Sequence, residues 1–362
     1  MFISHITLSN FRSYEKLDLP LKPGTHLFIG ENGEGKTNIV ESIMYLALQN
    51  SHRVSADAPL IKLGNQGAYI RAKIEERDRS ALIDLEINNS KANRAKLNQN
   101  PLRSQRELSG IVKAICFSPE DLDLVRGDPS ERRRFLDHLL IQRNPRLSGV
   151  LSDFERALKQ RNTLLKARAP EATLAPWNDH LATFGGEVIA ARISLINDLT
   201  PHFAAAYRTI SSKKSVSVTY KSSIDNPTDN KTTNKELILR KIAEVSYQER
   251  ERGISLVGPH RDDLILSLGE HPVKGYASHG ESWSVALSLR LASYQLLVSD
   301  GDSPILILDD VFSELDEARR EKLARVANQA EQTLITVAVE NDLPKEINGS
   351  RYRVVNGEVK AL

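Results

Sequence analysis

Short stretches in which apolar and polar residues alternate dominate the first 120 residues of the chain. They predict a strand that starts with residues 3–8, and an antiparallel layer that includes residues 69–74 and 82–87. The apolar run 27–29 ends in a glycine and predicts a buried strand, and from Lys36 onward apolar residues recur at helical spacing. This part of the chain is therefore predicted to contain both strands and helix.

The pattern changes near Arg146, where apolar residues begin to recur at spacings of three, four or seven. The segments 147–165 and 177–188 keep this spacing on either side of a proline-bounded break at 170–176, which predicts two long helices. An antiparallel helical hairpin and two ordinary amphipathic helices on a core fit equally well, because the repeat lasts for too few heptads to decide.

The α/β pattern returns after residues 222–234, a stretch rich in Ser, Thr, Asn and Asp that predicts a surface loop. The apolar run 303–308 predicts a buried parallel strand. A helix over 316–329 and another strand over 333–337 are predicted to follow.

The composition is that of a folded globular chain. Of the 362 residues, 40% are hydrophobic and 27% are charged, which argues against disorder and against a disulfide scaffold. No run approaches 18 apolar residues, and the first residues lack the pattern of a signal peptide, so we expect a cytosolic protein without a membrane span. The single cysteine, Cys116, agrees with a reducing compartment.

The net charge of +2 is too small to predict a nucleic-acid partner, so local basic clusters matter more. Three arginines are consecutive at 132–134, and the run 156–168 has five basic residues and no acidic one. Such runs are usually solvated helix faces. The candidate DNA contacts are Arg132, Arg133, Arg134, Lys159, Arg161 and Lys166.

Residues 30–37 fit the pattern G-x-x-x-x-G-K-[ST] of a phosphate-binding loop, and they lie between a predicted strand and a predicted helix. Glycines let backbone N–H groups turn toward a phosphate, and the helix N-terminus adds positive potential. Lys36 is expected to reach the β- and γ-phosphates of ATP, and the Thr37 hydroxyl to bind Mg²⁺. The candidate ATP-binding residues are Gly30, Glu31, Asn32, Gly33, Glu34, Gly35, Lys36 and Thr37.

Two acidic residues, Asp309 and Asp310, follow the apolar run 303–308. A buried parallel strand delivers the residues at its carboxyl end to the crevice where nucleotides bind. Asp309 is therefore the predicted partner of Mg²⁺, directly or through water, and Asp310 is predicted to orient the attacking water as a base. Taken alone, the pair could equally end a strand at a solvated turn, but the loop at 30–37 favours the catalytic interpretation.

A third motif, Ser278-His279-Gly280-Glu281, precedes a run of apolar residues at helical spacing. Ser278 can cap this helix, and Ser-x-Gly at a helix N-terminus can bind an anion. By itself the motif is more typical of an ordinary N-cap. Its position between the phosphate-binding loop and the acid pair favours a role in the nucleotide site.

The order of these motifs, with Asp316 after the acid pair, is similar to that of ABC-type ATPases. More specifically, the chain resembles the RecF family of bacterial recombination-repair proteins. The blocks that carry this resemblance extend over nearly the whole chain and lie at 8–14, 51–53, 117–122, 132–137 and 258–264.

The resemblance implies an α/β fold, the ABC-type P-loop ATPase head. Lobe I would hold a mixed sheet with the Walker motifs at 1–125 and 300–362, and a helical lobe II at 126–299 would carry a short hairpin and the Ser-x-Gly signature loop. The family resemblance further implies a weak, DNA-stimulated ATPase that uses ATP and Mg²⁺. Its ATP-dependent homodimer would bind double-stranded DNA and gapped junctions, and slow hydrolysis would release it.

The resemblance also implies partners and a cellular role. RecR is the expected partner, with RecO as a further candidate, and together they would promote RecA loading at single-strand gaps. The implied processes are replication restart and SOS induction, in the cytoplasm near the nucleoid.

In such a dimer, the signature loop of one copy would complete the site of the other. Ser278 and Gly280, with Glu281 beside them, would face the γ-phosphate bound to the partner's loop, and Asp316 would lie on the dimer seam. Arg12, which matches an early arginine of the family, would approach the phosphates from the side.

Two departures limit this transfer. ABC transport ATPases have a His after the strand that corresponds to 333–337, and this chain has none there. We also cannot assign a residue of this chain to the metal-contacting Gln of such ATPases. The region most comparable to the one that carries this Gln is 118–120. Slow hydrolysis is therefore expected.

Two other functions share the motifs. An ATPase subunit that energises a transporter seldom carries an insertion as long as 142–252 between the two phosphate-binding motifs. An SMC-like chromosome organiser would need a long coiled coil, and this chain has room only for a short hairpin. The leading hypothesis is therefore a DNA-binding ATPase of repair.

Overall fold

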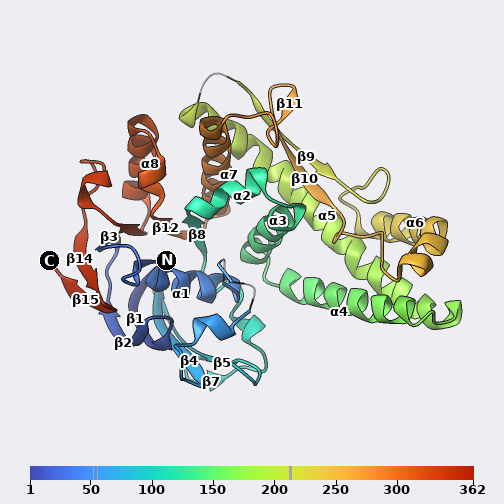
Figure 1. The fold of residues 1–362 in the computed structure, drawn as a ribbon, viewed down its shortest axis with the longest axis horizontal. Helices are drawn as coiled ribbons and strands as arrows, with labels where there is room; N and C mark the ends of the chain where they lie inside the picture. Colours follow the sequence, from blue (N-terminus) through green and yellow to red (C-terminus); the bar gives the residue numbers. More distant parts are fainter. Residues whose placement is uncertain (52, 55, 212–213) are drawn as a thin grey trace. The chain divides into compact units, whose positions relative to one another are not determined.

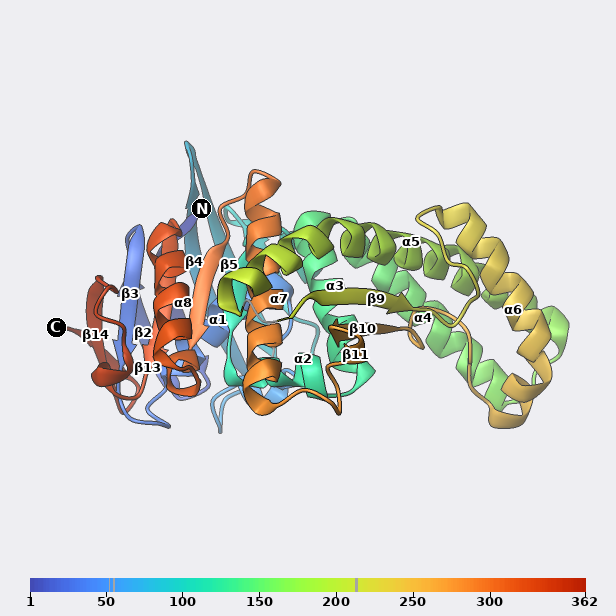
Figure 2. The same cartoon turned by 90° about the horizontal axis from the view of Figure 1, so that it is seen from above.

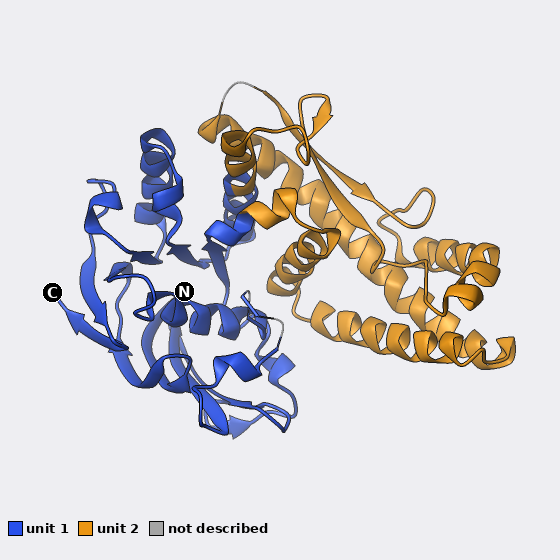
Figure 3. Cartoon of the chain, viewed as in Figure 1, with its two compact units in different colours: residues 1–121, 287–362 blue, residues 122–286 orange. Residues whose placement is uncertain are grey.

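The computed structural model describes residues 1–51, 53–54, 56–211 and 214–362. His52, one residue of the blocks that carry the family resemblance, lies outside the described residues. The chain forms two compact units, residues 1–121 with 287–362 and residues 122–286 (Figures 1 and 3). The second division falls within helix α7 (His279–Ser299), so this helix contributes to both units. That the units correspond to two ATPase lobes stays a prediction.

Unit 1 contains an antiparallel sheet built from the alternating segments near the N-terminus. Its strands are ordered β2-β1-β4-β5-β6-β7. One face of each long strand is buried, because every second residue is apolar. The bounds are β1 (Phe2–Phe11), β2 (Tyr14–Pro20), β4 (Gly67–Glu76), β5 (Arg79–Asn88), β6 (Arg94–Leu97) and β7 (Asn100–Pro101).

The second sheet of unit 1 has the order β15-β14-β3-β13-β12-β8, and all its strands are parallel except β15. The central strands β12 and β13 are buried along their whole length, as expected of a parallel sheet covered on both faces. The bounds are β3 (Gly24–Ile29), β8 (Ala114–Phe117), β12 (Ile305–Asp309), β13 (Gln332–Val337), β14 (Ser350–Val355) and β15 (Glu358–Ala361).

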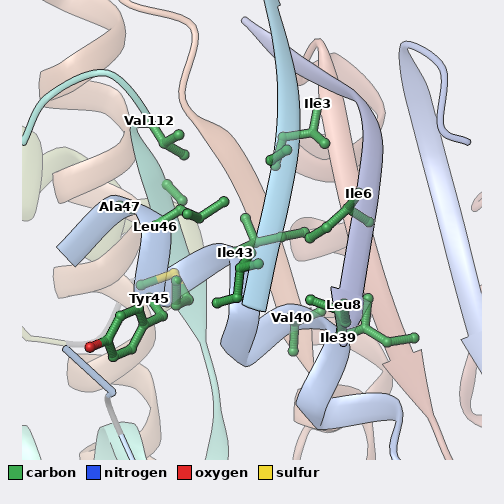
Figure 4. Packing of buried hydrophobic residues seen from close by; sticks show 14 of the residues in the cluster. Ile3, Ile6, Leu8, Ile39, Val40, Ile43, Tyr45, Leu46, Ala47 and Val112 are labelled. Atoms are coloured by element: carbon green, nitrogen blue, oxygen red, sulfur yellow. The ribbon is translucent and has the colours of Figure 1, made fainter. Parts of the chain in front are cut away.

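Helix α1 (Lys36–Leu48) lies in the core of unit 1, and all but two of its 13 residues are buried. Ile39 and Ile43 of this helix lie in one apolar cluster with Ile6 of the antiparallel sheet (Figure 4). The same cluster includes Ile307 of the parallel sheet. Two sheets therefore hold the helix that begins at the predicted phosphate-binding loop. Helix α8 (Glu317–Gln329) links β12 to β13, and short 3₁₀ turns complete the unit at 58–60, 105–108, 119–121, 311–314 and 340–342.

Unit 2 is mainly helical. Helices α4, α5 and α6 lie side by side (Figures 1 and 2) and share an apolar cluster that includes Phe154, Leu181 and Ile238. A three-stranded sheet has the order β11-β10-β9. The bounds are α2 (Leu122–Arg126), α3 (Pro129–Arg143), α4 (Leu147–Lys166), α5 (Glu171–Ile210), β9 (Val216–Lys221), α6 (Lys231–Arg252), β10 (Asp263–Leu268) and β11 (His271–Pro272).

Two predicted boundaries in unit 2 were wrong. The break between the long helices is shorter than 170–176, because α5 already begins at Glu171 and includes Pro176. The predicted loop 222–234 ends early, because Asn230 caps α6 by accepting hydrogen bonds from the N–H groups of Thr232 and Thr233. The resulting α6 packs on α5 as a third helix beside the predicted pair. No helix formed by the described residues is long and apolar enough to cross a membrane.

Candidate nucleotide site

Residues 30–37 form the loop between the end of β3 and the first turn of α1. Gly33 and Gly35 have φ values of 91° and 107°, a region that favours glycine. Gly30 has no room for a side chain, because an added Cβ would lie 2.2 Å from the carbonyl oxygen of Val354. The three glycines are therefore required by the shape of this loop.

The loop is supported from behind by two turns. In the C-terminal hairpin of β14 and β15, the N–H of Asn356 donates to the carboxylate of Glu34, and the N–H of Gly357 donates to the Glu34 carbonyl oxygen at 3.3 Å. At the start of β2, the hydroxyl of Tyr14 donates to the carbonyl oxygen of Gly35 at 3.1 Å. These contacts fix the backbone of the loop at Glu34 and Gly35.

The ammonium group of Lys36 lies inside the loop. Its Nζ donates to the carbonyl oxygens of Gly30 at 2.8 Å and Glu31 at 3.0 Å, and the residue is only 3% exposed. The positive charge is thus fixed at the centre of the loop, where a phosphate group would be enclosed by backbone N–H groups.

Asp309 lies at the end of β12, and its carboxylate faces the first turn of α1. Its Oδ1 accepts hydrogen bonds from the hydroxyl of Thr37 at 3.0 Å and from the hydroxyl of Thr336 at 2.6 Å. The pKa of Asp309 is raised to about 6, chiefly by burial and also by the charge of Asp310, while the two hydrogen bonds oppose the increase. A bound cation would reverse this effect by stabilising the carboxylate.

The donor set suits Mg²⁺. A hydroxyl and a carboxylate 3.0 Å apart are the hard oxygen ligands that this ion prefers, and it usually keeps water and phosphate oxygens as its other ligands. Within the described ranges, no group of three or more His, Cys, Asp or Glu side chains could hold a metal alone. Thr37 and Asp309 would therefore hold Mg²⁺ together with a phosphate group.

Thr336 was not identified as a site residue from the sequence. It pairs with Asp309 across β12 and β13, and besides its bond to that carboxylate it accepts a hydrogen bond of 3.0 Å from the N–H of Asp310. Asp310 adopts φ of 48°, which is uncommon for a residue other than glycine. The hydroxyl of Thr336 therefore holds both acidic residues. The order of the strands, which the sequence does not reveal, would have been needed to find it.

A cleft of about 450 Å³ opens over these groups. The residues of the predicted set that line it are Asn32, Gly33, Gly35, Lys36, Thr37 and Asp310. Arg53 and Pro119 line it too, although the motifs did not place them there. Both residues belong to blocks that carry the family resemblance, and this was the one sequence feature that could have indicated a place in the site.

Arg12 does not line this cleft in the part of the chain that the structure describes. Its guanidinium makes two hydrogen bonds to the carboxylate of Glu41, from Nε at 2.8 Å and from Nη2 at 2.6 Å. A third bond of 2.9 Å goes to the carbonyl oxygen of Pro59. The guanidinium of Arg12 is thus engaged elsewhere, and its contact with ATP stays a prediction.

The Ser-x-Gly motif forms the N-terminus of α7, in unit 2. The N–H of Ser278 donates to the Glu281 carboxylate at 2.9 Å, and the Ser278 hydroxyl accepts from the N–H of Glu281 at 3.3 Å, which is a capping box. The ammonium group of Lys214 pairs with Glu281 at 2.8 Å, and this bond with those of Ser278 lowers the pKa of Glu281 to about 2. Gly280 is half-buried and Ser278 is exposed, so the serine is accessible to a ligand.

Asp316 lies in unit 1, where it caps helix α8. Its side chain accepts from the N–H of Arg319 at 3.0 Å and pairs with the guanidinium of the same residue at 2.7 Å. More than half of the Asp316 side chain is exposed. It can therefore meet another molecule, but its place on a dimer seam stays a prediction.

Two of the six candidate DNA contacts are buried, which corrects the prediction for them. Arg132 is 4% exposed and makes two hydrogen bonds to Asp263, at 2.7 and 3.0 Å. Arg161 is 2% exposed and pairs with Glu249, which is fully buried, at 2.5 Å. A guanidinium enclosed with its own carboxylate is not available to a DNA phosphate.

The other four candidates are more accessible. Arg133 is half-buried, donates to the carbonyl oxygen of Asp262 at 2.9 Å, and has its pKa lowered chiefly by burial. Arg134 is exposed beside Glu131 on α3. Lys159 and Lys166 are exposed on α4 and line an open groove of about 430 Å³. The two lysines are therefore the best placed of the six to meet a phosphate backbone.

Comparisons with solved structures agree with the ATPase-head fold. The chain superimposes over its whole length on "the recombination mediator protein RecF-ATPrS in RecFOR pathway" with a TM-score of 0.92 at 26% identity, covering 98% of that chain. The ATP form of the same mediator gives 0.91 at 26% identity, with 99% of that chain covered. The Smc head domain of Pyrococcus furiosus gives 0.57 at 16% identity, with 96% of it covered, and it supports the fold alone. The predicted α/β ABC-type head is confirmed.

Sequence comparisons place the chain more closely. The family model described as "RecF/RecN/SMC N terminal domain" matches residues 2–358. A DNA replication and repair protein RecF of Streptomyces avermitilis is 48% identical over the full length of both chains. The RecF protein of Beutenbergia cavernae is 47% identical, with 99% of each chain covered. The chain therefore belongs to the RecF/RecN/SMC family and, within it, to the RecF proteins.

Proposed function

We propose that the protein is an ATP-driven switch that binds DNA as a dimer during recombinational repair. One observation carries the ATPase part of the proposal. The hydroxyl of Thr37 and the carboxylate of Asp309, 272 positions apart in the sequence, lie 3.0 Å apart beside the enclosed ammonium of Lys36. The loop at 30–37 and the carboxylate of Asp309 thus lie at one carboxyl edge of a parallel sheet, where nucleotides bind in such folds, and this supports the proposal.

The residues divide the chemistry among them. Lys36 and the N–H groups of the loop bind the β- and γ-phosphates, and Thr37 with Asp309 holds Mg²⁺, which neutralises charge that develops on the phosphates. Asp310, whose backbone is fixed by Thr336, orients a water molecule toward the γ-phosphate and accepts its proton. The departures noted at 333–337 and 118–120 support slow turnover, which suits a switch better than a motor.

Dimerisation is proposed from the Ser-x-Gly motif at the start of α7, whose Ser278 is exposed. Ser278 presents its hydroxyl at the exposed N-terminus of α7, and a helix N-terminus attracts an anion. In an ATP-dependent homodimer, Ser278, Gly280 and Glu281 of one copy meet the nucleotide of the other, and the exposed Asp316 lies on the seam. Hydrolysis then separates the two copies.

The DNA partner is proposed from the relatives and from the exposed cations. Relatives that match the whole chain are named DNA replication and repair proteins, and the matching solved structures are described as recombination mediators of the RecFOR pathway. Lys159, Lys166 and Arg134 supply exposed positive charge for a DNA backbone. We therefore propose binding to double-stranded and gapped DNA. RecR and RecO would assist RecA loading there, during replication restart and SOS induction.

The decisive experiment measures dimerisation and DNA binding in the same samples. Sedimentation velocity and fluorescence anisotropy with a gapped duplex are recorded with no nucleotide, with MgADP and with a non-hydrolysable MgATP analogue. We expect a dimer and tight, salt-sensitive DNA binding with the analogue alone. The proposal would be rejected by a monomer in all three conditions, or by a DNA affinity that changes neither with the nucleotide nor with the salt concentration.

A further inference from the structure

Glu41 is a buried carboxylate on α1, one turn after Thr37, and the chemistry above gives it no role. Its side chain is 0% exposed. Oε1 accepts from Arg12 and from the hydroxyl of Ser51, both at 2.6 Å, and Oε2 accepts from Arg12 at 2.8 Å. Burying a carboxylate is costly unless it is paired and hydrogen-bonded, so these donors keep Glu41 in place as an anion.

A second guanidinium, that of Arg53, lies beside the same carboxylate. Its Nη1 is 3.7 Å from Oε2 of Glu41, which is near enough for attraction but too long for a hydrogen bond. Among the described residues, the guanidinium of Arg53 makes no hydrogen bond, and 37% of the side chain is exposed. Because Arg12 occupies both oxygens of Glu41, Arg53 keeps its donors for another anion.

Ser51 links Glu41 to the backbone of Arg53 through hydrogen bonds. While its hydroxyl donates to Glu41, the same oxygen accepts hydrogen bonds from the backbone N–H groups of Arg53 at 3.0 Å and Val54 at 3.2 Å. This fixes the backbone from which the Arg53 side chain extends into the cleft that Lys36 also lines. Glu41 therefore controls Arg53 at its backbone and at its charged end.

The cluster is one carboxylate with two guanidiniums, so it leaves one positive charge at the wall of the cleft. We infer that Glu41 is a positioning residue that holds Arg53 at the nucleotide cleft, where the Arg53 guanidinium binds the triphosphate of ATP. Arg12 then serves as the counter-charge that keeps Glu41 buried and not as a phosphate ligand. This inference rests on the proposed ATP site and identifies an anion-binding arm of it.

A double-mutant cycle tests whether Glu41 acts through Arg53. The affinity for a fluorescent, non-hydrolysable MgATP analogue is measured for the wild type, Glu41→Gln, Arg53→Ala and the double variant. Glutamine keeps the shape of the side chain but removes the charge that attracts Arg53. We expect each single change to weaken binding roughly tenfold, and the double variant to bind about as well as Arg53→Ala alone. A double variant that is weaker than Arg53→Ala by the full effect of Glu41→Gln would overturn the inference.

Two further variants keep the result interpretable. If Glu41→Gln does not fold, Ser51→Ala replaces it in the cycle, because it removes the bond to Glu41 without leaving a buried charge unpaired. The matched control is Glu15→Gln, which removes the carboxylate of an exposed pair with Lys62 and should leave analogue affinity unchanged. Wild-type protein that fails to bind the analogue would reject the proposed function itself. Wild-type binding that Arg53→Ala leaves intact would reject only the role of Arg53 and Glu41.

Discussion

The hydroxyl of Thr336 donates a hydrogen bond of 2.6 Å to the carboxylate of Asp309, and it accepts one from the N–H of Asp310. We predict that Thr336→Val, which keeps the shape of the side chain, lowers ATP turnover roughly tenfold, because both acidic residues lose their anchor. Nucleotide binding should persist, as measured by fluorescence titration.

Thr333→Val is the control on the same strand, where the hydroxyl donates to the carbonyl oxygen of Ala327 instead. Each variant should lose about 1 kcal/mol of unfolding free energy, so a fall in turnover in both would contradict the prediction.

Lys36→Arg should retain some nucleotide binding but lose hydrolysis. The ammonium group occupies a space closed by the carbonyl oxygens of Gly30 and Glu31, and a planar, fork-shaped guanidinium does not fit the same contacts. Phosphate release and analogue binding are measured on the same preparation. Turnover at the wild-type rate would mean that the loop is not the catalytic site.

Asp310→Asn should accumulate an ATP-bound dimer. The amide keeps the size of the side chain, but it cannot accept a proton from the attacking water. Sedimentation velocity in excess MgATP should show a dimer that persists for longer than that of the wild type. In MgADP the same variant should be a monomer, which is the internal control. A monomer in both nucleotides would contradict the assignment.

Lys159 and Lys166 should each contribute one phosphate contact in the DNA complex. The double variant Lys159→Ala/Lys166→Ala is expected to bind duplex DNA more weakly and to reduce the slope of log affinity against log salt by about 2. The control is Lys241→Ala on the neighbouring helix, where the ammonium is already paired with Asp225 and Glu244. An unchanged slope in the double variant would exclude this face of α4.

His260 should make the protein less stable in mild acid. Burial lowers its pKa to about 4, and the nearby Arg261, Arg133 and Arg161 act in the same direction. The folded protein therefore keeps this imidazole neutral at pH values where the unfolded chain, with an ordinary pKa of about 6.5, takes up a proton. Stability from this residue is complete above pH 6.5 and is lost as pH falls toward 4, by on the order of 3 kcal/mol.

Urea unfolding at pH 7 and pH 5 measures the contribution of His260. The difference in stability between the two pH values should be smaller in His260→Gln than in the wild type. Equal differences in the two proteins would show that this histidine does not couple folding to pH.

The parts of the site that lie within one stretch of sequence could be predicted, because their chemistry is local. A glycine-rich loop between a strand and a helix must bring N–H groups together, and an acidic pair after a buried strand must lie at its carboxyl end. Thr336 and Glu41 could not be predicted in the same way. Each acts on a partner that only the order of strands, or the packing of α1 between two sheets, brings near.

The basic clusters also show that a contact between residues distant in sequence cannot be predicted from a local pattern. Lys159 and Arg161 are two positions apart in one basic run, yet the first is exposed and the second is buried with Glu249, 88 positions away. Arg132 is likewise buried with Asp263, 131 positions away. Charge patterning indicates where cations are concentrated, but the carboxylate that removes one of them from solvent is visible only in the fold.

The contact between Glu34 and the turn at Asn356 joins the two extremes of the sequence, 322 positions apart. A chain shortened after β13 would keep every residue that is expected to touch ATP and still lose the support that the turn at Asn356 gives to the phosphate-binding loop, leaving only the contact from Tyr14. We therefore expect fragments that isolate unit 1 to need the C-terminal hairpin, and we expect an insertion in that turn to disturb the phosphate-binding loop without reaching the nucleotide itself.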